Sequence, residues 1–263
     1  VSSKTWRNAI FLTLILTAVM THYANTTRYS EDWQRARQVW WQLSWRAPQL
    51  EPGTVLVAQL NGVEIAEDYV LWGPANLIYY PTMPKETLPI SAEVLSKPVQ
   101  EAIMLGEESE RVLRSIPLKK EFSKTLVMTT PSQSSCLHVI DGNSPELSSQ
   151  VDERIARIAT FSRIDLIQIT DEPRTPPVAI FGSEPDHTWC YYYQIAALAR
   201  QKEDWQRIVD LGDQALSEKL NSDDWVEWIP FIQAYAYMED YDAANELASL
   251  VRYNHYTRQQ ACN

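Results

Sequence analysis

The chain has 263 residues, enough for one large domain or two smaller ones, and its 45% hydrophobic and 22% charged residues are ordinary for a globular protein. Its 34 acidic residues outnumber its 23 basic residues, which gives a formal net charge of −11. Because phosphate binding needs a basic surface, this balance argues against nucleic acid as a partner.

The most hydrophobic stretch of the chain is AIFLTLILTAVM, at residues 9–20. It is shorter than the about 20 apolar residues that cross a bilayer, so it is compatible with a signal peptide, a buried core helix or part of a membrane helix. A signal peptidase would meet His22 where it prefers a small residue, whereas Trp6, His22 and Tyr23 suit the membrane–water interface. We therefore favour the membrane helix.

Residues 1–24 are thus predicted to form a hydrophobic helix that inserts in a membrane or in the core of an assembly. Because the chain begins at Val1 rather than Met, we expect a preceding segment to be removed or missing. The residues expected at the membrane or assembly interface come from this helix and from the Trp-rich segment after it: Trp6, Phe11, Leu14, Ile15, Trp33, Trp40, Trp41 and Trp45.

The N-terminal end of the chain is basic although the whole chain is acidic. Residues 1–50 hold six bases and two acids, which gives +4 and suits either an anionic lipid surface or a helix with solvated arginines. Two bases precede the hydrophobic run and three follow it closely, so the positive-inside rule, counted literally, places the soluble body in the cytoplasm.

Residues 25–49 are predicted to form a separate amphipathic connector helix. Ser30 is its candidate N-cap, and Pro48 ends it. At about 100° per residue, one broad aromatic stripe is formed by Trp33, Trp40, Trp41 and Trp45. Such a stripe fits a lipid headgroup boundary, the protein's own core or, as a third interpretation, stacking on sugar.

Strand and helix patterns mix in residues 50–185, which predicts an α+β or α/β domain that ends in a Pro-rich linker. Asn61-Gly62 predicts a hairpin turn between a strand at 54–60 and a partner at 63–73. The other expected strands are 76–80, 111–116, 125–130, 136–141, 164–169 and 178–182, and the expected helices lie in 91–106 and 148–161.

Residues that could carry out chemistry are few, and we predict no catalytic residue, no metal site and no cofactor in this chain. No GxGxxG or P-loop is present, and the three cysteines, Cys136, Cys190 and Cys262, form no CxxC. At most one internal disulfide is possible, and buried free thiols are favoured.

The polar candidates are Asp68 and, near a predicted strand end, His138 and Asp141, with Cys136 on the same side of the strand as His138. A Cys–His pair is a nucleophile arrangement in principle, but structural residues at a strand end are the favoured interpretation. A rival class, an enzyme domain for glycosyl transfer or hydrolysis, would use these polar side chains.

An internal repeat occupies the C-terminal part of the chain, residues 186–263. At an offset of 36 residues, Glu203-Asp204-Trp205 aligns with Glu239-Asp240-Tyr241. This pattern resembles the tetratricopeptide repeat, although glutamates stand where that family has its turn glycine. The resemblance implies a surface for a protein partner, for which the candidate residues are Tyr193, Trp205, Tyr235 and Tyr241; a purely structural helical cap is the alternative.

A wider resemblance links residues 40–48, 52–58 and 71–81 to the soluble tail of polytopic bacterial membrane proteins that are similar to GT-C-type glycosyltransferases acting on lipid-linked sugars. In that class the catalytic acids lie between earlier membrane helices, so no catalytic residue is carried over to this chain. The resemblance implies that residues 25–263 lie outside the cytoplasm, against the charge count.

Taken together, the patterns predict a membrane-proximal, extracytoplasmic or cell-surface protein without a catalytic site, which acts in interaction or assembly. Its partners would be another protein or further copies of itself, and a membrane through the N-terminal helix. Two alternatives stay open. One is a processed subunit of an extracellular filament or oligomer with hydrophobic helices in its core, and the other is an accessory domain of a membrane glycosyltransferase.

Overall fold

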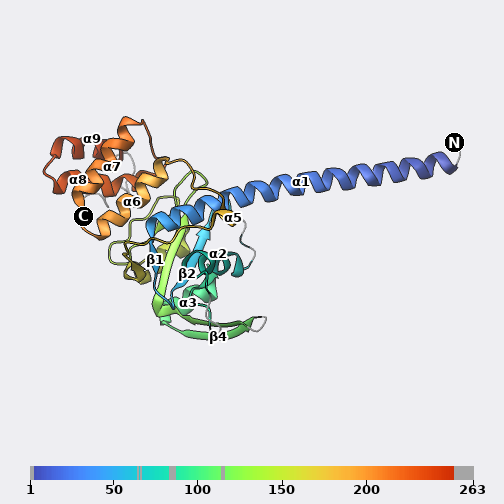
Figure 1. Ribbon diagram of the computed structural model, residues 1–263, viewed down its shortest axis with the longest axis horizontal. Helices are drawn as coiled ribbons and strands as arrows, with labels where there is room; N and C mark the ends of the chain where they lie inside the picture. The colour runs from blue at the N-terminus through green and yellow to red at the C-terminus, as the bar shows by residue number, and fades with distance from the viewer. Residues whose placement is uncertain (1–2, 64, 66, 83–86, 114–115, 252–263) are drawn as a thin grey trace.

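The computed structural model describes residues 3–63, 65, 67–82, 87–113 and 116–251. Within these residues a mixed helix-and-sheet body lies between a long N-terminal helix and a group of C-terminal helices (Figure 1). This confirms the mixed fold class, the apolar N-terminal helix and the helical C-terminal part.

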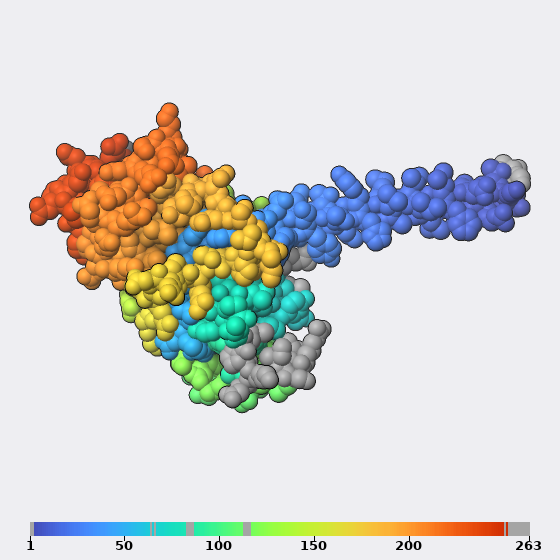
Figure 2. Space-filling view, viewed as in Figure 1, coloured from blue at the N-terminus to red at the C-terminus, as the bar shows by residue number. Residues whose placement is uncertain are grey.

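Helix α1 (Ser3–Arg46) is one continuous helix of 44 residues. Its first part projects from the body and its last part lies within it (Figures 1 and 2). The predicted break between residues 24 and 25 and the N-cap at Ser30 are wrong, because neither glycine nor proline interrupts the segment and the helix continues through Ser30. Pro48 ends the helix as expected, since the residue before a proline is disfavoured in helical conformation.

The central sheet has the order β3 (Ser91–Val94), β2 (Val55–Leu60), β6 (Thr125–Thr130) and β7 (His138–Val139). Strand β2 runs parallel to both β3 and β6, whereas β7 is antiparallel to β6. Strands β1 (Gln49–Leu50) and β8 (Ile167–Gln168) form one small pair. Strands β4 (Glu108–Leu113) and β5 (Ile116–Glu121) form another.

Helices cover both faces of the sheet. Helix α2 (Tyr69–Tyr79) and the inner end of α1 share a core with Leu56 and Ala58 of β2. Helices α3 (Lys97–Leu105) and α4 (Glu153–Ile158) share a second core with Val55 and Val57. Because side chains alternate along a strand, β2 supplies both cores and reads as an uninterrupted apolar run. The body is therefore an α/β sandwich with one antiparallel edge strand.

The predicted hairpin at Asn61-Gly62 is absent, because β3 and β6 already occupy both edges of β2. The predicted strand at 76–80 is also wrong: it lies in helix α2, where Asn76 is buried and bonds through its side chain to both the carbonyl and the N–H of Ile90. These tertiary contacts override the strand propensity of the segment.

Three further segments differ from the expectation. Residues 178–182 contain a single helical turn, α5 (Val178–Phe181), rather than an edge strand, and the turn stops at Gly182 with φ 69°. Of the predicted strand at 164–169, the first half is the 3₁₀ turn η3 (Ile164–Leu166). Residues 91–106 begin as strand β3 and become helical only from Lys97; Gly106 caps that helix in the left-handed conformation. Further 3₁₀ turns are η1 (Phe122–Lys124) and η2 (Ala159–Phe161).

The C-terminal part consists of α6 (Trp189–Gln201), α7 (Trp205–Ser217), the 3₁₀ turn η4 (Trp225–Trp228), α8 (Ile229–Tyr237) and α9 (Tyr241–Val251). These helices share a third core, and α6 also packs along the inner end of α1. The inner end of α1 is thus enclosed between α2 and the sheet on one side and α6 on the other.

The two helical hairpins have the same turn. Glu203 and Glu239 both adopt positive φ, 56° and 63°, which a glycine would adopt without strain. The side chains of Asp204 and Asp240 each accept a hydrogen bond from the backbone N–H three residues later. The 36-residue repeat in the sequence therefore corresponds to a repeat in backbone conformation.

Candidate functional site

The outer part of α1, residues 3–33, is exposed along almost its whole length. The predicted interface residues of its first turns are exposed by 58–64%: Trp6, Phe11, Leu14 and Ile15. By length and composition, α1 is the one helix among the described residues that is able to cross a membrane. The hydroxyls of Thr13 and Thr17 donate to the carbonyls of Ala9 and Thr13, so these polar groups are satisfied inside the helix.

The Trp-rich segment divides between surface and core. Trp33 is 41% exposed, but Trp40 and Trp41 are 3% and 4% exposed and are core residues. Their assignment to a membrane or assembly interface is therefore wrong, and the interpretation as the protein's own core holds for them. Trp45 is half-buried: its indole N–H donates to Glu184, and its ring meets Tyr191 edge-on. The reason is that α6 and α2 cover the face of α1 that carries Trp40 and Trp41.

Two of the four residues predicted to bind a partner lie inside the helical core. Tyr193 and Tyr235 are 8% and 2% exposed, because they are on the faces of α6 and α8 that pack against neighbouring helices. That part of the prediction is wrong. Trp205 is half-buried and stacks on Tyr237 with ring centroids 4.1 Å apart, and Tyr241 is 61% exposed.

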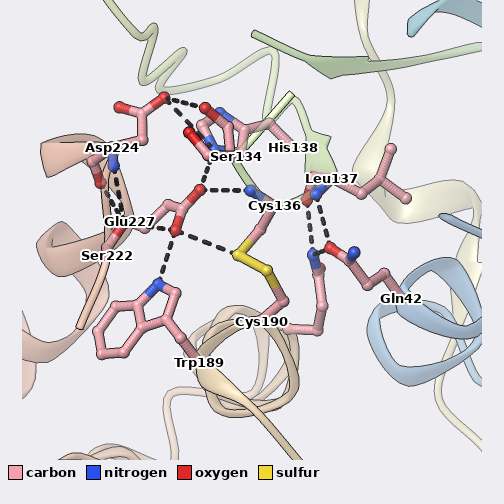
Figure 3. The surroundings of a disulfide bond; sticks show 12 residues. Gln42, Ser134, Cys136, Leu137, His138, Trp189, Cys190, Ser222, Asp224 and Glu227 are labelled. Carbon is pink, nitrogen blue, oxygen red and sulfur yellow. Dashed lines mark hydrogen bonds and ion pairs between the residues drawn. A yellow bond between two sulfur atoms is a disulfide. The ribbon is translucent and has the colours of Figure 1, made fainter. Parts of the chain in front are cut away.

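The cysteines do not remain free thiols. Cys136 and Cys190 form a disulfide that joins the start of the β7 region to α6 (Figure 3). This overturns the favoured interpretation of buried free thiols, since the fold brings together residues 54 positions apart. Cys262 lies outside the described residues.

A buried polar network surrounds the disulfide, and its centre is Glu227 of η4 (Figure 3). The Glu227 carboxylate is 1% exposed and accepts hydrogen bonds from the N–H of Cys136 (2.7 Å), the indole of Trp189 (2.6 Å) and the hydroxyl of Ser222 (2.6 Å). His138 Nε2 lies 3.0 Å from Oε1 of the same carboxylate, the oxygen that also accepts from Cys136. Such donors stabilise a charge that would otherwise be costly to bury.

His138, Asp224 and Glu227 form the one described group of side chains with metal-ligating atoms in mutual reach, within 4.8 Å. Burial lowers the pKa of His138, but the hydrogen bond to Glu227 and the charges of Glu227 and Asp224 outweigh it and raise the pKa above its ordinary value. Both oxygens of Glu227 already accept hydrogen bonds, Oε1 from the N–H of Cys136 and Oε2 from Trp189 and Ser222. The arrangement therefore fits an ion-paired structural network better than a metal centre.

The other polar candidates lie apart from this network. Asp68 is buried at the start of α2 and pairs with Lys120 (3.1 Å) and Arg111, and Lys120 also pairs with Glu93 (2.6 Å). Asp141 lines a small cavity that His138 also borders. The structure thus brings His138 and Asp141 to one cavity but leaves Asp68 elsewhere, in a network of paired charges.

No family model, curated protein or solved structure matches this chain. The resemblances to tetratricopeptide repeats and to the tails of GT-C-type proteins therefore stay predictions.

Two residues of these sites have no distinctive signal in the sequence. Glu227 lies in the stretch DDWVEWIP, and Arg46, which lines the cavity beside Asp141 and His138, is one of six bases in residues 1–50. The one signal that could have drawn attention to Glu227 is its place between two tryptophans directly before the apolar helix α8. A lone charge among buried aromatic residues needs a partner.

Proposed function

We propose that the outer half of α1 anchors this protein in a membrane and that the rest of the chain is an extracytoplasmic interaction module without a catalytic site. The observation that carries the proposal is the exposure of the outer half: apolar side chains face outward around the helix with no polar face among residues 9–20. A surface helix of a soluble protein keeps a polar face, whereas a helix that is apolar all round is surrounded by lipid or protein.

The length of α1 supports this arrangement. Residues 3–33 extend for about 45 Å, which exceeds the about 30 Å of a hydrocarbon core. Trp6 near one end and Tyr23, Tyr29 and Trp33 toward the other are exposed aromatic residues suited to the two interfaces. The folded body, which begins near Ala36, would then lie close to the membrane surface.

The disulfide favours the extracytoplasmic side. Disulfides persist in secreted and cell-surface proteins and are rare in the reducing cytosol. Cys136 and Cys190 also fix α6 to the sheet, so the bond belongs to the folded core of the body. This argument opposes the literal charge count around the hydrophobic run, and it favours the same side as the resemblance to GT-C tails.

The C-terminal hairpins are the proposed partner surface. Their matching turns support the tetratricopeptide-like interpretation, in which stacked hairpins present a surface to a protein ligand. Near these turns, Tyr237 and Tyr241 are 65% and 61% exposed, and Trp205 stacks on Tyr237. Exposed aromatic side chains of this kind are enriched in protein–protein contacts.

Membrane extraction of the full chain tests the anchor. A double variant, Leu14→Arg with Ile15→Arg, introduces two charges at the centre of the apolar run, each costing about 2.5–3.5 kcal/mol on insertion. We expect the wild type to stay with membranes after alkaline carbonate washing and the double variant to be released. The matched control is Val112→Arg, a charge at an apolar position of the body that is 69% exposed. Retention of the double variant would contradict the proposal.

The same preparation distinguishes lipid from a filament core. If α1 lies in lipid, mild detergent should disperse the wild type to small, uniform particles in sedimentation. Polymers that survive detergent and disappear in the double variant would favour the assembly alternative. Labelling of intact cells with a membrane-impermeant amine reagent, followed by peptide mapping of Lys202, tests the side. Labelling only after lysis would contradict the extracytoplasmic placement.

A further inference from the structure

A small polar cavity of about 70 Å³ lies where the end of α1 meets β7 and α6. The residues that define its chemistry are Arg46 from α1, His138 and Asp141 from the β7 region, and Gln194, Arg200 and Gln201 from α6. Ser144 and Glu146 complete its polar wall, and Ser144 is exposed, so the cavity borders solvent on that side.

Arg46 is the unusual residue of this cavity. It is 4% exposed, and its one hydrogen bond runs from Nη1 to the side-chain oxygen of Gln201, at 2.9 Å. No carboxylate among the described residues lies within ion-pair distance of its guanidinium. A guanidinium has five N–H donors, and a buried charge is normally paired. Most of the donor capacity of Arg46 is therefore unused.

The other cations of the cavity do have carboxylate partners. Arg200 pairs with Glu146, at 2.7 and 2.9 Å from Nη1 to the two carboxylate oxygens, and His138 pairs with Glu227 at 3.0 Å. Burial and the neighbouring charge of Arg200 lower the pKa of Arg46 to about 10, so the side chain still carries its charge at neutral pH. The hydrogen-bond partner of Arg46 is thus a neutral amide, and the charge of Asp141 favours the charged form of Arg46 only from beyond ion-pair distance.

Gln194 lies beside the cavity but is completely buried. The side-chain oxygen of Gln194 is buried without a hydrogen-bond partner among the described residues, although its amide nitrogen donates to the carbonyl of Leu137 at 2.6 Å. An unpaired buried acceptor costs free energy, just as an unpaired donor does. Because that oxygen is out of reach of a water molecule, the group that the cavity itself lacks is an anion beside Arg46.

We propose that this cavity is a binding site for a small monocarboxylate. The carboxylate would take the free N–H donors of Arg46 in the bidentate geometry that suits a guanidinium. The volume equals about two water molecules, which limits the ligand to a few heavy atoms. Asp141 and Glu146 on the wall disfavour a doubly charged anion such as phosphate.

Titration calorimetry on the full chain in detergent tests the site, with sodium glycolate, glycine, sodium acetate and sodium chloride as probes. We expect saturable heat with the three carboxylates and no saturable heat with chloride. Arg46→Lys should weaken binding about ten- to hundredfold, because it removes the bidentate donor pair. Arg157→Gln, at an exposed arginine outside the cavity, is the matched control and should bind as the wild type does.

A second variant keeps the test valid if changes at Arg46 unfold the protein. Gln201→Glu places a carboxylate where an amide oxygen now lies 2.9 Å from Arg46, so the charge would be paired internally. We expect this variant to keep the near-ultraviolet circular dichroism of the wild type and to lose glycolate binding. Binding of chloride alone, absence of saturable heat with every probe, or unchanged binding by Gln201→Glu would each overturn the proposal.

Discussion

The two halves of α1 share one unbroken helix but lie in opposite surroundings. The outer part, residues 3–33, carries apolar side chains around its circumference and projects from the body (Figure 1), and at its end Trp33 lies beside Phe181 with ring centroids 5.9 Å apart. The inner part buries Val39, Trp40 and Leu43 in a core shared with the sheet and α6. Continuity of the backbone follows from the absence of glycine and proline. Whether a part of α1 is exposed or buried depends instead on the contacts that its side chains make with other elements.

Polar residues of the inner half show how it is held. Arg37 donates to the carbonyl of Phe181 at 2.5 Å, and Gln42 accepts hydrogen bonds from the backbone N–H of Leu137 and, at 3.3 Å, the side chain of Gln194. Within residues 9–20, the side chains of Thr13 and Thr17 donate to carbonyls four residues earlier in the same helix. Polar side chains with long-range hydrogen bonds therefore distinguish the part of α1 that packs in the folded body. Residues 9–20, whose polar side chains are two threonines, do not pack there.

The largest expected effect on stability is the difference between a tryptophan of the inner part and one of the outer part. Trp40→Ala removes a buried ring and should lower the free energy of unfolding by about 3–5 kcal/mol, whereas Trp6→Ala should leave it unchanged. Urea denaturation of the full chain in detergent, followed by circular dichroism, measures both. Equal losses in the two variants would break the comparison, because the outer half would then be part of the folded core.

Loss of the disulfide should weaken the attachment of α6, which packs on the inner part of α1, to the sheet. Replacement of both Cys136 and Cys190 by alanine should lower the free energy of unfolding by about 2–4 kcal/mol, since the crosslink restricts the unfolded chain. The same denaturation assay under non-reducing conditions measures this. The wild type treated with a reducing agent should approach the variant, and a variant as stable as the oxidised wild type would refute the expectation.

A smaller effect separates two glutamines one turn apart on α1. Gln42→Ala leaves the buried N–H of Leu137 without its acceptor and should cost about 1–3 kcal/mol. Gln38→Ala, at an exposed position of the same helix, should cost little. Thermal unfolding of both variants in parallel is the measurement, and similar melting temperatures would show that Gln42 does not hold the inner half.

The smallest effect concerns pH. Because the folded-state pKa of His138 is raised, protonated His138 contributes stability that is fully present below the ordinary value of 6.5 and is lost as pH rises through the raised pKa. The free energy of unfolding should therefore decline gradually above pH 6.5. His138→Gln should flatten that slope, and an identical slope in the variant would assign it to another group.

The sequence allowed a good prediction of the elements whose signals are local. The apolar run, the strands at 54–60 and 125–130, and the 36-residue repeat all recur in the structure, because each depends on periodicity within a short window. Glu203 and Glu239 both adopt positive φ, so the two hairpin turns share one conformation although neither contains a glycine at this position. The strand predicted at 76–80 was wrong because the buried hydrogen bond between Asn76 and Ile90 joins distant segments and leaves no signal in local propensity.

The candidate sites were harder to predict, since they depend on contacts between distant segments. The disulfide joins residues 54 positions apart, and Glu227 meets His138 across 89 positions. Composition could not distinguish Trp33, which is exposed, from Trp40, which is buried two turns later. The difference is which face of α1 the helix α6 covers, and that depends on the fold of the whole chain.

The unbroken course of α1 has a geometric consequence for the body. A helix without a hinge transmits rotation and tilt. The sheet and the C-terminal hairpins therefore rotate and tilt together with residues 9–20. One residue added near Thr27 would turn the body by about 100° and raise it by about 1.5 Å, whereas seven added residues would nearly restore its heading. In the proposed membrane arrangement, a partner that approaches along the membrane would thus meet a face of the body whose direction is set by the length of this helix.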